Sequence, residues 1–185
     1  MGGAAFLRGV PIDGAPSDTS AGFAPGVVGG VLLGQDLYDH WGGEIRYLFE
    51  QRDPRVSSGG TSATLAGQAH MLGYDLIYHV RSREERVRPY FALGGGMKLF
   101  WGTGAEEPYR PLMQYAYLTH ERQAEPMVSV GGGVKWPMGK RMALRLECRD
   151  QITPFPQKLI APAPAMAIKG WLHDFVPTVS LSWRL

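Results

Sequence analysis

The feature that most restricts the fold of this chain is a strict two-residue alternation of apolar and polar side chains. In residues 127–150, MVSVGGGVKWPMGKRMALRLECRD, apolar side chains occupy every second position on both sides of a short turn. The positions between them hold glycine, serine and full charges, among them Arg145, Glu147 and Arg149. Successive side chains of a β-strand point to opposite faces, which gives this period. The stretch is therefore predicted to form two strands with one apolar and one ionic face.

The same period recurs along most of the chain, and helical patterns of useful length are missing. Stretches rich in glycine and proline separate the alternating segments, as expected for turns between strands. A chain of 185 residues suits one domain with a sizeable interior. Eight strands are predicted, near residues 2–9, 23–34, 41–52, 62–80, 87–103, 126–136, 141–151 and 174–185.

The connections between these strands alternate in length. GQDLYDH, RSREER and PMGK are short, and the longer loops lie near residues 10–22, 53–61, 104–125 and 152–173. An up-and-down meander with all its short turns at one rim has this alternation, and so do transmembrane barrels. Both chain ends are then expected at the short-turn rim. The predicted fold is all-β, a single domain over residues 1–185 that forms an eight-stranded antiparallel up-and-down transmembrane β-barrel.

The choice between a membrane barrel and a soluble barrel depends on which face points inward. An eight-stranded barrel has an interior only wide enough for side chains. The apolar stripes are rich in Trp, Phe, Tyr, Leu and Met, which would overfill it, whereas the other face combines small residues with long charged ones. The apolar stripes are therefore expected to face lipid. A soluble calycin-like ligand-binding barrel, with the faces reversed, is the alternative.

The positions of aromatic residues favour the membrane orientation. Two interfacial girdles are predicted, one beside the short turns or the C-terminus and one beside the long loops. From Phe175 to Trp183 a tilted strand spans on the order of 20 Å, close to the apolar band of an outer membrane. The membrane-interface aromatics are Trp41, Tyr78, Trp136 and Trp183 at the first girdle and Trp101 and Phe175 at the second.

The second half of the chain resembles a known family. RPYFALGGGMKLFWG (88–102), VSVGGGVKWPMGKRMALRLECRD (128–150) and VPTVSLSWRL (176–185) are similar to the last four strands of the OmpA-like outer-membrane β-barrel superfamily. The resemblance implies the outer membrane of a Gram-negative bacterium, a signal peptide that is expected to have been removed, and assembly by the barrel insertion machinery. Leu185 stands where the superfamily usually has an aromatic residue. Pro177 interrupts the last strand and is expected near the outer rim.

If the apolar stripes face lipid, a set of charged residues must point into the barrel. A buried ion needs a partner, so interleaved acid–base pairs are expected across neighbouring strands, with Lys135, Arg145 and Glu147 at the centre. The pairs either plug the barrel and fix the strand register, or line a narrow, gated or anion-preferring path. The predicted interior ion-pair network is Glu44, Arg46, Glu50, Asp75, Arg88, Lys98, Lys135, Arg145, Glu147 and Arg149.

Several other classes of function lack a signal in the sequence. A net charge of +2, with basic residues interleaved among apolar ones, gives no nucleic-acid patch, so no nucleic acid is expected as a partner. The single cysteine, Cys148, allows no intrachain disulfide and no multi-cysteine metal site. The glycine triplets 94–96 and 131–133 do not lead into helices, unlike phosphate-binding loops. No cofactor and no metal are expected.

No catalytic residues are predicted either. The five histidines are dispersed, and the chain has no HExxH or G-x-S-x-G motif. His79 is followed by VRS and lacks the His-x-Ser pattern of the eight-stranded lipid A deacylases. Adjacent strand residues such as His173 and Asp174 point to opposite faces. A dyad assembled across loops, for example between His120 and His173–Asp174, stays open.

The long loops are the remaining functional candidates. Residues 104–125 contain three tyrosines and mixed charge, which suits a binding surface. Residues 152–173 are rich in proline and apolar for an exposed loop, so they either fold over the rim and pack on themselves or contact a partner protein. The expected function is that of a non-enzymatic outer-membrane barrel with a structural or loop-mediated interaction role. A narrow small-solute or ion pore and a lipid-active outer-membrane enzyme are the other candidates.

Overall fold

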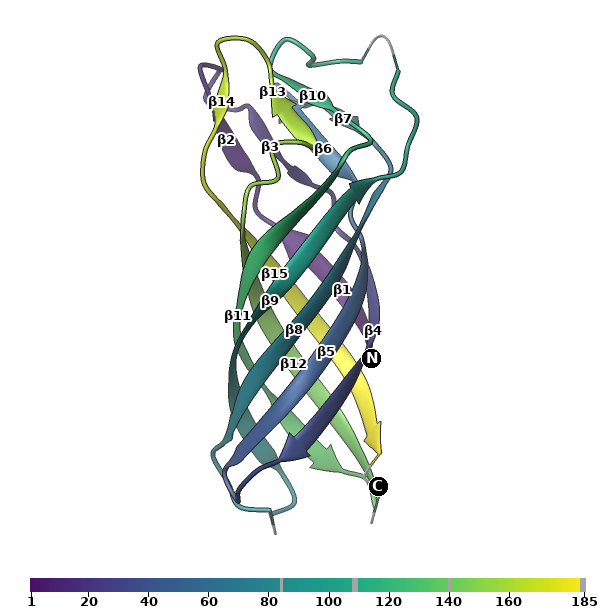
Figure 1. The fold of residues 1–185 in the computed structure, drawn as a ribbon, viewed down its shortest axis with the longest axis vertical. Coiled ribbons are helices and arrows are strands. Elements are labelled where there is room, and N and C mark those ends of the chain that lie inside the picture. The colour runs from purple at the N-terminus through teal and green to yellow at the C-terminus, as the bar shows by residue number, and fades with distance from the viewer. Residues whose placement is uncertain (84, 108–109, 140, 184–185) are drawn as a thin grey trace.

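Eight long strands close into a barrel (Figure 1). The structure, a computed structural model, describes residues 1–83, 85–107, 110–139 and 141–183. Around the barrel the strands are β1 (Gly2–Leu7), β15 (Trp171–Trp183), β12 (Met142–Pro154), β11 (Arg122–Pro137), β9 (Arg88–Gly102), β8 (Gly67–His79), β5 (Trp41–Gln51) and β4 (Gly26–Asp36). All neighbouring pairs are antiparallel, so the predicted all-β, eight-stranded, up-and-down barrel is confirmed. Among the described residues, no helix is long and apolar enough to cross a membrane.

The long connections fold into a cap over one end of the barrel (Figure 1). Five short strands form one sheet in the order β14-β2-β3-β6-β7, and β10 pairs with β13. β6 and β7 are joined by a tight turn through Gly59 and Gly60, whose φ angles of 55° and 78° favour glycine. The cap strands are β2 (Val10–Asp13), β3 (Ser20–Phe23), β6 (Pro54–Ser58), β7 (Thr61–Thr64), β10 (Ala116–Leu118), β13 (Ile160–Pro162) and β14 (Ala167–Ile168).

The cap has a hydrophobic core of its own, which continues into the mouth of the barrel. Leu159 and Ile160, in the Pro-rich connection between β12 and β15, are fully buried in this core. The barrel residues Phe100 and Leu172 belong to the same core, and the Phe100 ring stacks on Phe23 at 5.1 Å between centroids. The apolar composition of this connection therefore serves packing within the cap.

The wall of the barrel is apolar outside and polar inside. The outward-facing Trp136 and Trp183 are 58% and 63% exposed, whereas the inward-facing Arg46 and Arg145 are 2% and 1% exposed. This polarity is the reverse of that of a soluble protein, in which large apolar side chains are buried and arginine rarely is. Glycine makes room for the large inward side chains, because a Cβ at Gly133 would collide with the hydroxyl of Tyr90.

The two ends of the chain lie at different heights. β15 ends beside Met142, at the short-turn rim, as predicted; Arg184 and Leu185 of the last predicted strand lie outside the described residues. The prediction that the N-terminus lies at the same rim is wrong. Gly2 pairs with Val179 and Gly29, partway along the barrel wall, and the Met1 ammonium donates a hydrogen bond to the Gly30 carbonyl at 2.9 Å.

The sequence predicted Pro177 near the outer rim, and this prediction is wrong. Pro177 lies in the middle of β15, opposite Cys148. Its missing N–H falls on the β1 side of the strand, where the paired positions skip from Gly3–Thr178 to Phe6–Phe175. The proline therefore interrupts the β1–β15 ladder and leaves the β12–β15 ladder continuous.

Candidate functional site: the ionic interior and the cap pocket

The inward side chains form two ionic clusters. The central cluster lies in the half of the barrel nearer the short turns, and the upper cluster lies below the cap. The central cluster consists of Glu44, Arg46, Asp75, Lys135, Arg145, Glu147 and Arg149, and the upper cluster of Glu50, Arg52, Lys98 and Asp174.

In the central cluster, each of the three carboxylates contacts at least two cations. The Arg145 guanidinium donates to both oxygens of Glu44, at 2.6 and 2.7 Å, and also contacts Glu147. Glu147 also pairs with Arg46 and with Arg149, the latter at 3.1 Å. All these side chains are at most 5% exposed except Lys135, which is 21% exposed and lies 3.2 Å from Glu44. This dense pairing offsets much of the desolvation of the buried ions.

Asp75 connects the central cluster to β8. It lies 3.2 Å from Arg46 Nε and 2.9 Å from Arg149 Nη1. Tyr90 completes the cluster, because its hydroxyl donates to Glu147 at 2.7 Å and accepts a hydrogen bond from Arg145 Nε. Tyr90 was not predicted to belong to the network, although it alternates with Phe91 and therefore points inward.

In the upper cluster, the Lys98 ammonium uses three donors. It donates to Glu50 at 2.6 Å, to Asp174 at 2.7 Å and to the amide oxygen of Gln151 at 2.7 Å. Arg52 contacts the same two carboxylates, and its Nε lies 3.0 Å from Glu50. Arg52 and Asp174 were not among the residues predicted from sequence. Continuing the inward alternation of Glu44, Arg46 and Glu50 by two residues would have identified Arg52.

Arg88 is inward-facing and buried, but it belongs to neither cluster. Its guanidinium lies at the short-turn rim, donates to the carbonyls of Asp39 and Arg81 at 2.9 and 3.4 Å, and approaches Asp36 at 3.6 Å. The structure therefore divides the predicted network into a central cluster, the Glu50–Lys98 part of an upper cluster, and a rim contact.

An apolar layer separates the two ionic clusters. Leu48 follows Arg46 and precedes Glu50 along β5, and it is 1% exposed. Val176 follows the upper-cluster residue Asp174 along β15. A continuous water-filled path along the barrel would have to cross this layer, which consists of Ala5, Val28, Leu48, Met71, Met127 and Val176.

The six predicted interface aromatics all lie on the outer face. Trp41 and Tyr78 contact each other edge to face, with ring centroids 5.0 Å apart. Trp101 is partly covered by the Arg122 guanidinium, whose carbon lies 3.6 Å from the ring centroid. Exposed side chains include Trp41, Tyr78, Trp136, Phe175 and Trp183.

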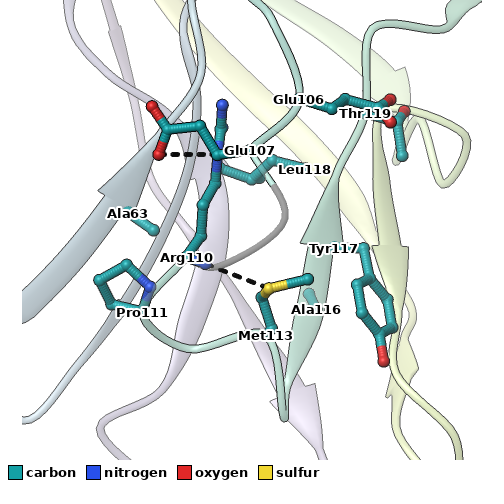
Figure 2. Close-up of a pocket in the computed structure, with 10 residues that line it drawn as sticks. All are labelled: Ala63, Glu106, Glu107, Arg110, Pro111, Met113, Ala116, Tyr117, Leu118 and Thr119. Carbon is teal, nitrogen blue, oxygen red and sulfur yellow. Dashed lines mark hydrogen bonds and ion pairs between the residues drawn. The ribbon is translucent and has the colours of Figure 1, made fainter.

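The cap contains a cavity of about 100 Å³. Figure 2 shows the residues around it, with Arg110 between Glu107 and Met113. At its edge, Glu106 accepts a hydrogen bond from the backbone N–H of His120 at 2.9 Å and contacts the His120 ring at 2.7 Å. The backbone hydrogen bond, followed by the nearby imidazole, lowers the pKa of Glu106.

The histidines do not form the dyad that the sequence left open. His120 pairs with Glu106, and His173 pairs with Asp150 at 2.8 Å on the outer face of the wall. Asp174 points inward to Lys98, so His173 and Asp174 lie on opposite faces. Within the described part of the chain, no group of three or more His, Cys, Asp or Glu side chains could hold a metal ion.

Comparison with known proteins adds little to this description. No family model matches the chain, and no curated protein matches its sequence. Among solved structures, the chain is similar to the N-terminal β-barrel domain of Pseudomonas aeruginosa OprF, with 14% identity, a TM-score of 0.46, and coverage of 98% of this chain and 96% of that one. The fold and the site define a small eight-stranded barrel with an apolar exterior and an ion-paired interior.

Proposed function

We propose that this protein is a non-enzymatic β-barrel of a bacterial outer membrane, sealed by its ion-paired interior and presenting the cap outside the cell. The supporting observation is the reversed polarity of the wall, with exposed tryptophans outside and buried arginines inside. In water, this wall would expose a far larger apolar surface than soluble monomers tolerate. A soluble ligand-binding barrel would need an apolar interior, and here the interior holds the central and upper clusters.

The height of the apolar band suits an outer membrane. On β9, Phe91 and Trp101 are ten residues apart and both face outward. At roughly 3.3 Å per residue and a tilt of about 40°, this distance corresponds to roughly 25 Å along the barrel axis. The resemblance of the second half of the chain to the OmpA-like superfamily supports this proposal, which includes insertion by the barrel assembly machinery.

Heat-modifiable gel migration tests the proposal. The chain refolded into detergent or lipid vesicles is expected to migrate faster before boiling than after boiling, because a closed barrel resists the gel detergent. It should also resist extraction from vesicles by alkaline carbonate. A chain that folds and stays monomeric without detergent would contradict the proposal and favour the soluble barrel.

A narrow ion path is the second candidate, and one observation favours it. The central cluster contains four cations and three carboxylates, which leaves a buried positive surplus that would attract anions. The apolar layer opposes conduction. Planar-bilayer recordings separate the two candidates: a sealed barrel gives no steady conductance, whereas a path would show conductance that changes in Lys98→Gln or Arg145→Gln.

The cap is the surface we propose for a protein partner. The large apolar side chains of the connection between β12 and β15, such as Leu159, Ile160 and Ile168, are buried within it. A partner would therefore meet the connection between β9 and β11, where Tyr117 is 39% exposed beside the cap cavity. Measuring the mass of lipid A from bacteria that express the chain separates this interaction role from a lipid-active enzyme. An unchanged mass supports the interaction role, and a changed mass supports the enzyme.

A further inference from the structure

The outer wall carries a preformed cation–aromatic pair where its apolar band ends below the cap. Arg122 begins β11 and lies directly opposite Trp101 in the β9–β11 ladder. The guanidinium carbon is 3.6 Å from the centre of the indole ring, within cation–π contact distance. Arg122 is exposed. The contact with Trp101 therefore restrains the guanidinium, while the exposure of Arg122 leaves N–H groups accessible to a ligand.

The surroundings of this pair are apolar on one side and polar on the other. Toward the short turns, the outward side chains on the same two strands are Leu99, Met97, Ala124 and Pro126. On the cap side lies Lys158, an exposed cation whose backbone N–H donates to the Gln123 side chain at 2.7 Å. A ligand that fits this place has an acyl portion along the wall and an anionic group at the level of Arg122.

We propose that Arg122, held by Trp101, binds the phosphate of an anionic lipid headgroup, one without a compensating cation, at the outer boundary of the apolar band. This inference rests on the proposed membrane location and names a lipid class for it. A planar guanidinium donates two parallel hydrogen bonds to phosphate oxygens, and its edge is directed by the stack rather than free to rotate.

The full chain is refolded into mixed micelles of detergent, phosphatidylcholine and phosphatidic acid. Native mass spectrometry then counts the lipid molecules of each kind that the chain retains. The wild-type chain is expected to retain phosphatidic acid in preference to phosphatidylcholine. Loss of one charge-assisted bidentate contact should reduce that preference by about tenfold in Arg122→Gln. Arg122→Lys should recover only part of it, because an ammonium neither stacks nor binds in a bidentate manner.

Arg8→Gln is the matched control. Arg8 is exposed and follows the wall residue Leu7, which pairs with Asp174 near the cap end of β15, so this variant removes the same charge at a similar height. Retention of phosphatidic acid should be nearly unchanged in Arg8→Gln and reduced in Trp101→Leu. Equal losses in Arg8→Gln and Arg122→Gln would indicate a general charge effect and overturn the proposed site, as would full retention in Arg122→Gln.

Heat-modifiable migration of the same samples separates this inference from the proposed function. Variants that shift normally but lose phosphatidic acid support the site. If the wild-type chain shifts normally but shows no preference for phosphatidic acid, the site is wrong while the membrane barrel stands. If the wild-type chain shows no shift, the membrane location itself fails, and this inference fails with it.

Discussion

Glu147 contacts three buried arginines, and its neutralisation gives the sharpest test of the ionic seal. The carboxylate contacts Arg46, Arg145 and Arg149 and accepts the Tyr90 hydroxyl, with its side chain 1% exposed. Glu147→Gln keeps the shape but leaves four buried cations facing two carboxylates. Removing one partner of a buried ion pair costs about 3–5 kcal/mol, so the free energy of unfolding should fall by roughly that amount.

The measurement is urea-induced unfolding in lipid vesicles, followed by the change in gel migration. Glu85→Gln is the matched control, because Glu85 pairs with Arg81 at 3.2 Å on a half-exposed turn. Such a surface pair contributes about 0.3–0.5 kcal/mol. If Glu147→Gln shifts the unfolding free energy no more than Glu85→Gln does, the interior is hydrated enough to screen its charges and the sealed-barrel reasoning is wrong.

Further predictions concern the wall, the cap and the apolar layer. Gly133→Val should destabilise the barrel by about 1–3 kcal/mol in the same urea assay, because the new side chain meets Tyr90. The backbone amide of His120 should be protected from hydrogen exchange at pH values above the normal pKa of glutamate, because the Glu106 carboxylate accepts its hydrogen bond. Protection should be lost as the pH falls through the lowered pKa of Glu106, since the protonated acid accepts this bond only weakly. Glu106→Gln should abolish this pH dependence. Leu48→Ser should introduce bilayer conductance that the wild-type chain lacks, because it opens the layer between the ionic clusters; a silent variant would place the barrier elsewhere.

The barrel could be predicted from sequence because its strands are long and strictly alternating. A strand with one face toward a different environment repeats its pattern over many residues, as β12 and β15 do. The inward charges followed from the same alternation. Which cation meets which carboxylate could not be predicted, because Arg46 reaches Glu147 across the barrel, 101 positions along the chain.

The cap could not be predicted for the opposite reason. Its strands are two to five residues long, too short to show a period, and they lie among prolines and glycines that signal loops. Their partners come from distant segments, as when β10 pairs with β13. The apolar content of 152–173 was the available signal, and it indicated burial without indicating the partner. Arg52, by contrast, lies within the predicted strand 41–52 and continues its inward alternation, so the sequence did contain the signal for it.

The tight turn between β6 and β7 has a consequence for engineering. Gly60 has open space around it. The turn joins β6 to β7, and β7 is an edge strand of the five-stranded sheet. A foreign peptide grafted there would lengthen a hairpin tip without disturbing the apolar residues beneath, whereas a graft at Leu159 would split the stacked core that joins cap and wall. With the cap outside the cell, as proposed above, this turn would be a defined position for displaying epitopes on a cell surface.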